Sequence, residues 1–388
     1  MIANIVHISL NAGGGGERLA VATIKALSSI GIDVDLFTLE NPDWEAIYNA
    51  HGTSIDAEIK NIRSLNILQK YQPHNYSLTI NTHGDMLPFY QKHFTKRTAI
   101  TYCHYPIAIY LIDSSDPDYS TVLQNICPSG MAPVLRNEYY REARTAYVKM
   151  MLSSTVLTNS NFSRKAIFKT FGVDSTVLPP PVDVDTFRKA CMASNVRDDF
   201  ILVISRFHPT KKIENAIHLA KLLHQNDLGT CMNIVGNMTP DSIGYFNYLN
   251  HLVKHYGLQD YIKFDTNLKF SRLLELMRRS KVYIHPLPGE PFGISTVEAM
   301  SAGIIPVVPD IGGHTEFVPQ KYQFHTFGQG VEAVATALAA PASERIKLSD
   351  SAKKFSAVNY IKKLQQILIE RTDIGKRYVT SKPILSLS

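Results

Sequence analysis

The sequence has 388 residues, more than one hydrophobic core of ordinary size contains, so we expect two domains. With 45% hydrophobic and 19% charged residues, a largely disordered chain is excluded. The net charge is +6, and the positive excess lies in residues 186–388. This excess suits an anionic ligand such as a nucleotide, and equally an ordinary solvated surface.

The cysteines and the amino terminus indicate a reducing compartment. None of the four cysteines belongs to a CxxC pair, so neither a disulfide framework nor a zinc site is predicted; they are Cys103, Cys127, Cys191 and Cys231. Residues 1–9 resemble a buried strand more than a signal peptide. No run approaches the ~20 apolar residues that span a bilayer. We therefore expect a cytoplasmic protein that at most lies on a membrane surface.

The first half begins as a β–turn–α–β unit. A strand over 2–10 is followed by four glycines at 13–16, a helix over 17–31 and a strand over 34–38. Further strands are expected at 77–83, 97–105 and 154–160. This order predicts a doubly wound domain. Three consecutive prolines make residues 178–187 the expected linker.

The alternation of strands and helices restarts after the linker. Strands are expected at 200–206, 230–236, 261–266, 281–287 and 304–309, and helices at 214–225, 271–280, 294–303 and 360–371. The second half therefore predicts a second parallel sheet. Two doubly wound domains would leave a cleft between the carboxyl ends of their strands, where ligands bind in such sheets.

The stretch GEPFGISTVEAMSAGIIPVVPDIGG, residues 289–313, contains the main candidate site. Gly289 to Gly293 form a turn, and the N–H groups of the helix that follows could hold a phosphate. Glu298 on this helix could reach the hydroxyls of a ribose, and Glu290 a second polyhydroxylated group. The alternative is a capping box in which Ser295 and Glu298 only satisfy the helix end.

Two other loops could face an anionic ligand. Arg206 and Lys211 follow the strand at 200–206, where two cations could neutralise a leaving diphosphate. A solvated basic loop is the alternative for these two residues. The glycines at 13–16, ahead of Glu17, would let backbone amides face an anion, although their spacing is not a dinucleotide-binding fingerprint.

The block E-P-F-G-x-x-x-V-E-A-M-x-x-G at 290–303 resembles the E-x7-E signature of retaining glycosyltransferases of family four. The resemblance implies the GT-B fold: two doubly wound, Rossmann-like α/β domains facing each other across a cleft. It implies that Glu298 binds the nucleotide ribose and that Glu290 contacts the donor sugar. It also implies a place beside the diphosphate for Phe292, Gly293 and Ile294.

Other segments resemble the same family. Residues 205–211 are similar to its GRxxxxK segment, with Ser205 in place of the glycine, which implies that Arg206 and Lys211 hold the diphosphate. Residues 11–18, NAGGGGER, and YCHYP at 102–106 resemble a subgroup of GDP-mannose-dependent α-1,2-mannosyltransferases that act on polyprenyl-diphosphate-linked glycans. This subgroup places His104 at the donor sugar, although a buried core histidine is the alternative. The remaining binding residues implied are Gly14, Gly15, Gly16, Glu17, Gly236 and Asn267.

The resemblance predicts a retaining hexosyltransferase that moves mannose from GDP-mannose to a hydroxyl of a glycan linked to polyprenyl or dolichyl diphosphate. The expected catalytic residues are Glu290, His104, Arg206 and Lys211, with neither a metal nor another cofactor and with no nucleic-acid partner. We expect an acceptor-binding domain at 1–180, a nucleotide-sugar-binding domain at 181–355, and at 356–388 a closing helix that returns to the first domain, plus a tail.

Several alternatives stay open at this point. The donor could be a UDP-sugar and the hexose glucose. A glycosidase pair, an epimerase, a phosphorylase and a non-catalytic glycan-binding protein are the competing classes. Aromatic and basic residues at 86–97 and the apolar stretch 106–112 predict peripheral contact with the cytosolic membrane face, or else a half-buried helix and strand.

Overall fold

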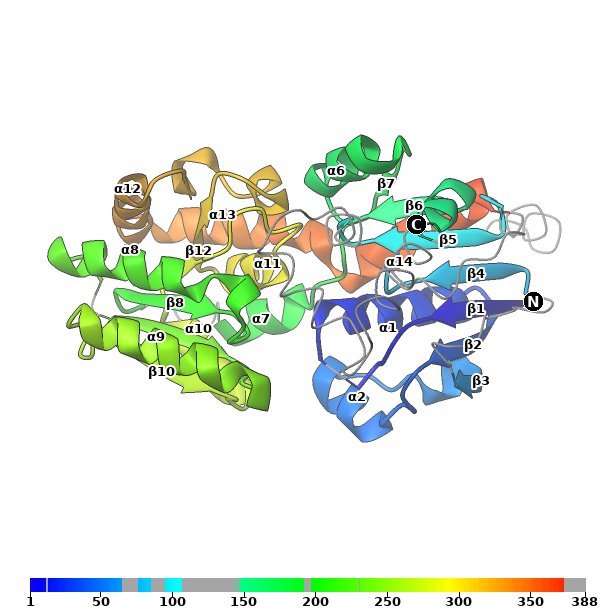
Figure 1. Ribbon diagram of the computed structural model, residues 1–388, viewed down its shortest axis with the longest axis horizontal. Coiled ribbons are helices and arrows are strands. Elements are labelled where there is room, and N and C mark those ends of the chain that lie inside the picture. The colour runs from blue at the N-terminus through cyan, green and yellow to red at the C-terminus, as the bar shows by residue number, and fades with distance from the viewer. Residues whose placement is uncertain are drawn as a thin grey trace, which may run out of the picture. The chain divides into compact units, whose positions relative to one another are not determined.

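The chain forms two compact units in the computed structural model (Figure 1). Unit 1 comprises Met1–Pro181 and Ala357–Ser388, and unit 2 comprises Val182–Ser356. The structure describes residues 1–11, 13–64, 76–84, 95–106, 145, 147–191, 197–229 and 231–372. The predicted membrane-contact segments, 86–97 and 106–112, lie mostly outside these residues.

Unit 1 is built on a parallel sheet with the strand order β3-β2-β1-β4-β5-β6-β7. Its strands are β1 (Ile2–Val6), β2 (Asp33–Thr38), β3 (Ile59–Ser64), β4 (Leu78–Asn81), β5 (Ala99–Cys103), β6 (Thr155–Thr158) and β7 (Thr176–Val177). Its helices include α1 (Gly15–Ser28), α2 (Trp44–His51), α6 (Asn161–Phe171) and α14 (Ala357–Arg371). The strand order reverses between β1 and β4, so the carboxyl ends of these two strands form the topological switch point.

The last described helix returns the chain to unit 1. Helix α14 lies beside α1 (Figure 1), and the hydroxyls of Thr23 and Tyr360 are 2.8 Å apart. Leu364 and Leu368 of α14 are buried in the same core as Ile24 of α1. Helix α14 thus belongs to the core of unit 1.

Unit 2 is built on a second parallel sheet, with the order β10-β9-β8-β11-β12-β13 and a switch point between β8 and β11. Its strands are β8 (Phe200–Ile204), β9 (Cys231–Gly236), β10 (Ile262–Thr266), β11 (Val282–Ile284), β12 (Ile305–Pro309) and β13 (Gln323–Phe324). Its helices are α7 (Val184–Cys191), α8 (Ile213–Gln225), α9 (Ile243–His255), α10 (Phe270–Arg279), α11 (Ile294–Ser301), α12 (Phe327–Leu338) and α13 (Ala342–Ala352).

The unit 2 sheet is buried on both faces, as a parallel sheet between helices requires. Along β8, Ile201 and Val203 belong to one apolar cluster, and Phe200 and Leu202 belong to the other. This alternation fixes the register of the strand, because a shift by one residue would exchange the two faces. The two predicted parallel sheets are confirmed.

The linker is shorter than predicted. Residues 178–183 connect the units, but helix α7 begins at Val184, inside the stretch assigned to the linker. The side chain of Asp183 accepts a hydrogen bond from the backbone N–H of Thr186 at 3.3 Å, as an N-cap residue does. The prolines end at Pro181, so nothing prevents a helix from starting just beyond them.

Candidate functional site

The loop that carries Glu290 is held by the double glycine that follows β12. The backbone N–H of Gly313 donates to the carbonyl of Glu290 at 2.8 Å, and Gly289 donates to the carbonyl of Ile311 at the same distance. Gly312 has φ +133°, and a Cβ there would lie 2.8 Å from the Glu290 carbonyl oxygen. Glycine is therefore required at Gly312 for the two loops to meet.

The carboxylate of Glu290 is held ionised by two partners. Its Oε2 lies 3.1 Å from Nζ of Lys211 and 3.4 Å from Nε2 of His285. Burial alone would raise the pKa of Glu290, but the charge of Lys211 and the contact with His285 outweigh it and hold the pKa well below its usual range. The Glu290 side chain is 15% exposed, so a ligand can still reach it.

A tight turn after β8 directs Lys211 toward Glu290. Residues 209–211 form one turn of 3₁₀ helix, and Nδ1 of His208 accepts a hydrogen bond from the Thr210 N–H. Lys212 then adopts a left-handed conformation, with φ +49°, and its side chain is exposed. Lys211 rather than Lys212 is thus the cation beside Glu290. Arg206, on the same loop, has an exposed side chain.

The hydroxyls of Tyr283 and Ser295 orient His285 toward Glu290. Nδ1 of His285 lies 2.9 Å from the hydroxyl of Tyr283, which lies 2.7 Å from the hydroxyl of Ser295. Burial raises the pKa of Tyr283, so its hydroxyl keeps its proton. If Tyr283 donates to Nδ1, the remaining proton of a neutral His285 is on Nε2, facing Glu290.

The capping-box alternative for Ser295 and Glu298 is wrong. Helix α11 begins after Gly293, a left-handed residue with φ +93° and no side chain to cap the helix. The Ser295 hydroxyl instead contacts the hydroxyl of Tyr283 on β11. Glu298 is half-buried on α11 and its role as a ribose ligand stays a prediction.

Of the three residues predicted beside a diphosphate, Phe292 offers only its backbone. Its side chain is 4% exposed, and its ring packs against those of Phe317 and Phe355 at centroid distances of 5.3 Å. Gly293 and Ile294 form the amino end of α11, where unpaired N–H groups are available to an anion.

Gly236 and Asn267 hold the end of β9. A Cβ on Gly236 would lie 1.8 Å from the Ser205 carbonyl oxygen, so no other residue fits this position without moving the backbone. The amide oxygen of Asn267 accepts a hydrogen bond from the Met238 N–H at 2.9 Å. Asn267, which has φ +52°, therefore positions the loop after β9.

In unit 1 the family motif places His104 directly after β5. Its Nε2–H donates to the carbonyl of Thr82 at 3.1 Å, and its own carbonyl accepts from Asn159 at 2.8 Å and Ser163 at 3.1 Å. The segment at 158–163 thus anchors the His104 backbone. Burial, opposed by the bond to Thr82, lowers the pKa of His104 to about 4, so the imidazole is neutral at pH 7.

The glycine-rich turn of unit 1 opens helix α1. Gly14 is its N-cap, Gly15 and Gly16 are its first residues, and Glu17 is in its first turn. The Glu17 carboxylate folds back over the turn: a Cβ on Gly14 would lie 2.4 Å from its Oε2. A carboxylate therefore already occupies the amino end of α1, where an anion had been expected.

Four further histidines lie after strands of the two units and were not predicted from the sequence to be site residues. His7 and His83 follow β1 and β4 in unit 1, and His285 and His314 follow β11 and β12 in unit 2. Each comes soon after a buried strand, which is the signal that could have identified them. His314 donates from Nε2 to the Pro309 carbonyl at 2.8 Å, and burial and then His285 lower its pKa to about 4.

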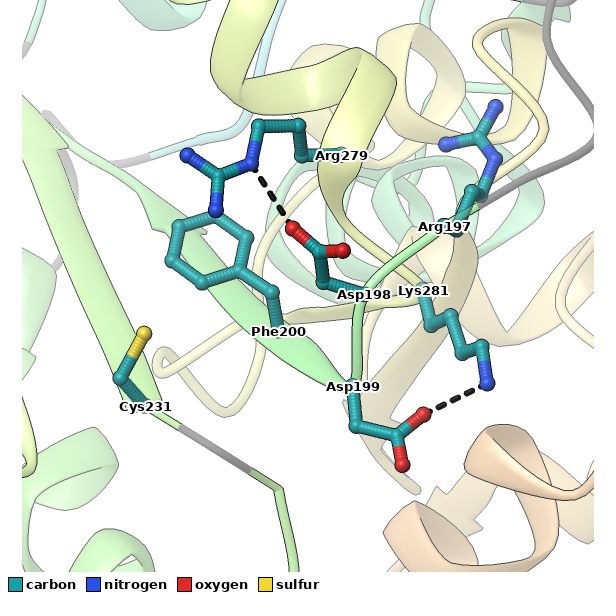
Figure 2. Close-up of a pocket in the computed structure, with 7 residues that line it drawn as sticks. All are labelled: Arg197, Asp198, Asp199, Phe200, Cys231, Arg279 and Lys281. Atoms are coloured by element: carbon teal, nitrogen blue, oxygen red, sulfur yellow. Dashed lines mark hydrogen bonds and ion pairs between the residues drawn. The ribbon is translucent and has the colours of Figure 1, made fainter.

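A surface pocket in unit 2 lies at the opposite edge of the sheet (Figure 2). Its residues precede or begin β8, β9 and β11. Arg279 pairs with Asp198 at 2.8 Å and Lys281 with Asp199 at 2.5 Å. Because these charges neutralise each other at the amino ends of the strands, this pocket is not the candidate site.

Two further properties concern only the described residues. Among them, no group of three or more His, Cys, Asp and Glu side chains is arranged to hold a metal ion. Within the same ranges, every helix is too short or too polar to cross a bilayer.

The chain is similar to known glycosyltransferases. Residues 187–356 match the family described as "Glycosyl transferases group 1". A relative from Dictyostelium discoideum named "GDP-Man:Man(3)GlcNAc(2)-PP-Dol alpha-1,2-mannosyltransferase" is 28% identical over 237 residues, 56% of this chain and 47% of that protein. The human protein of the same name is 25% identical over 284 residues, 65% of this chain and 56% of its own length. The chain thus spans about half the length of these relatives.

Solved structures share the architecture of the whole chain. Sucrose-phosphate synthase from Thermosynechococcus elongatus has a TM-score of 0.68 at 17% identity, covering 98% of this chain and all of its own. Anabaena HepE, in complex with UDP and glucose, has a TM-score of 0.66 at 16% identity, covering 95% and 99% of the two chains. Residues 187–356 therefore form a glycosyltransferase group 1 domain, in a chain of two parallel-sheet α/β units with the GT-B fold.

Proposed function

We propose that the protein is a retaining hexosyltransferase that transfers mannose from GDP-mannose to a hydroxyl of a polyprenyl-diphosphate-linked glycan. The observation that carries this proposal is the ionised Glu290, held by Lys211 and His285 beside the amino end of α11. The names of the relatives support the choice of mannose and of the lipid-linked acceptor.

In the proposed reaction, unit 2 binds the nucleotide sugar and unit 1 binds the acceptor. Lys211, Arg206 and the first N–H groups of α11 stabilise the negative charge that develops on the leaving diphosphate. Glu290 accepts hydrogen bonds from the hydroxyls of the sugar, and Glu298 from those of the ribose. His104, neutral at pH 7, hydrogen-bonds the sugar without adding charge.

Bond formation proceeds on the face that the diphosphate leaves. The anomeric C–O bond to the diphosphate breaks, the acceptor oxygen bonds to the same face of the anomeric carbon, and a diphosphate oxygen takes the acceptor proton. No carboxylate acts as the nucleophile. Because Lys211, Arg206 and helix N–H groups supply the positive charge, we propose that neither a metal nor another cofactor is needed.

The experiment that tests the proposal measures binding and transfer with the same full-length protein. Thermal unfolding with GDP, UDP, GDP-mannose and UDP-glucose identifies the donor, because a ligand that binds the folded state raises its Tm. Transfer from GDP-mannose to Man(3)GlcNAc(2)-PP-dolichol is then followed with and without EDTA. We expect stabilisation by GDP-mannose, an EDTA-resistant product, and an α anomeric signal in its NMR spectrum.

Each alternative gives a different result. Stabilisation by UDP-glucose but not by GDP-mannose would favour a UDP-sugar donor, which the UDP complex of the structural relative HepE makes the second candidate. Nucleotide binding without product from any donor would indicate a non-catalytic binding protein. Loss of activity in EDTA that Mg²⁺ restores would contradict the metal-free reaction.

A further inference from the structure

The amino end of α1 lies beside a buried histidine, His7, that faces a carboxylate. His7 follows β1 and is fully buried, and its Nδ1 lies 3.0 Å from the Thr82 hydroxyl. The same hydroxyl lies 3.1 Å from the carbonyl of Val6, which also accepts a hydrogen bond from the backbone N–H of Thr82 at 3.1 Å. Because the backbone N–H of Thr82 already pairs with the Val6 carbonyl, the Thr82 hydroxyl can donate its proton to Nδ1, and the remaining proton of a neutral His7 is then on Nε2.

The other nitrogen of His7 is directed at Glu17. Nε2 lies 3.8 Å from Oε1 of Glu17 and has no hydrogen-bond partner within the part of the chain that the structure describes. This distance exceeds that of a hydrogen bond but is within the range of an ion pair. A buried polar nitrogen without a partner is unfavourable, so its place against the carboxylate indicates a functional arrangement.

Glu17 is the member of this pair that a ligand can reach. Its side chain is 18% exposed, whereas that of His7 is 1% exposed. Burial alone would raise the pKa of Glu17, but the contact with His7 and its own backbone N–H outweigh it and lower the pKa, so the carboxylate is ionised. The exposed group is thus a fixed hydrogen-bond acceptor.

Three neutral imidazoles lie near this pair. The ring of His83 lies 5.3 Å from that of His7, and burial followed by the neighbouring imidazoles lowers its pKa to about 3. Burial lowers the pKa of His104 to about 4, and burial followed by the charge of Arg18 lowers that of His51, on α2, to about 4. Neutral imidazoles beside a carboxylate suit sugar hydroxyls and disfavour phosphate.

We propose that Glu17 binds a hydroxyl of a sugar substrate and that His7 is the buried positioning residue that holds its carboxylate. This inference rests on the proposed function. It reassigns the glycine-rich turn from phosphate binding to hydroxyl recognition. The hydroxyl belongs either to the transferred hexose or to the acceptor glycan, and the kinetics distinguish these two sources.

The test compares conservative variants of the full chain. E17Q keeps the size of the side chain and removes its charge. H7N keeps an amide group near the position of Nδ1 for Thr82 and removes the nitrogen that faces Glu17, whereas H7Q places a nitrogen near the position of Nε2. E45Q is the matched control, because Glu45 is an exposed acidic residue in the first turn of α2. Far-UV circular dichroism and Tm identify any variant that fails to fold.

We expect E17Q to raise one KM about tenfold or more, as the loss of a charged hydrogen bond does. A raised KM for GDP-mannose identifies the transferred hexose as the source of the hydroxyl, and a raised KM for the lipid-linked glycan identifies the acceptor. H7N should follow E17Q, H7Q should recover part of the loss, and E45Q should match the wild type.

The inference fails if E17Q leaves both KM values within twofold of wild type, or if H7N and H7Q are equally impaired. G14A provides a check that removes no polar group, because its Cβ would displace the Glu17 carboxylate. A wild-type KM in folded G14A would also count against the inference. A wild-type protein without transfer activity would instead refute the proposed function.

Discussion

The two sheets place a histidine at each switch point, but with opposite electrostatic surroundings. In unit 2, His285 follows β11 and shares the Glu290 carboxylate with Lys211. In unit 1, His7 follows β1 and faces Glu17 among neutral imidazoles. The same local element thus supports two environments: a lysine contacts the carboxylate in unit 2, and imidazoles surround it in unit 1.

This difference indicates that the residue beside a carboxylate determines which ligand the carboxylate can bind. Lys211 lies on the loop after β8, the strand next to β11, and brings positive charge to the edge where a diphosphate would leave. The corresponding edge of unit 1 carries the neutral His83 and His104. A cation in direct contact with the acid suits phosphate chemistry, whereas a histidine in that place suits hydroxyl recognition.

The largest effect is expected from breaking the charged pair of unit 2. Lys211→Ala and Glu290→Gln should each reduce the transfer rate about 10²–10³-fold, as the loss of one group from an electrostatic site does. The measurement is kcat with GDP-mannose. Lys212→Ala is the control, since this neighbouring lysine is exposed. Rates within a few-fold of wild type in both variants would refute the site.

The second prediction tests the backbone that positions the unit 2 site. Gly236→Ala should lower the free energy of unfolding by about 3 kcal/mol, the upper range for overpacking, because its Cβ would overlap the Ser205 carbonyl. Gly244→Ala is the control: no atom lies within 4 Å of its added Cβ, and alanine favours the helix. Urea unfolding measures both, and equal midpoints would contradict the geometry.

Substitution of His285 should lower kcat by less than substitution of Lys211. His285→Asn removes the nitrogen that faces Glu290 and should lower kcat about tenfold, the equivalent of one hydrogen bond. His285→Gln, which keeps a donor near that position, should retain most of the activity. Equal losses in both variants would show that the imidazole acts by packing alone.

Strands and helices with strong apolar patterns can be predicted from the sequence. Strands such as β8 and β12 are apolar runs, and the motif at 290–303 indicates Glu290 as a candidate site residue. The edge strand β3 was not predicted, because most of its side chains are exposed and IKNIRS has little apolar alternation. Helix α7 was assigned to the linker because it follows three prolines.

The partners of the site residues were harder to predict than the residues themselves. His7 and Thr82 are 75 positions apart, and they meet only because β1 pairs with β4. The use of Gly312 to hold Glu290 likewise depends on the pairing of β11 with β12. A sequence motif contains the residues that are expected to contact substrate. The residues that position them are brought together only by the fold.

The smallest expected effect is a loss of stability at low pH, caused by the neutral histidines of unit 1. His51, His83 and His104 of unit 1 have lowered pKa values of about 4, 3 and 4, against His314 alone in unit 2 among the described residues. Unfolded histidine titrates near ~6.5, so between this pH and about 4 the unfolded chain binds more protons than the folded chain. Stability is therefore lost as pH falls, and unit 1 should lose more than unit 2.

The single tryptophan makes this comparison measurable. Trp44 lies at the start of α2 in unit 1, partly buried against its core, whereas far-UV circular dichroism reports on both units. We expect the urea midpoint from Trp44 fluorescence to fall between pH 7 and pH 5 by more than the midpoint from circular dichroism. If the two midpoints move together, the units unfold as one or the histidines of unit 1 are not held neutral. His51→Gln distinguishes these cases, because removing one buried neutral histidine should reduce the pH dependence only if that histidine contributes to it.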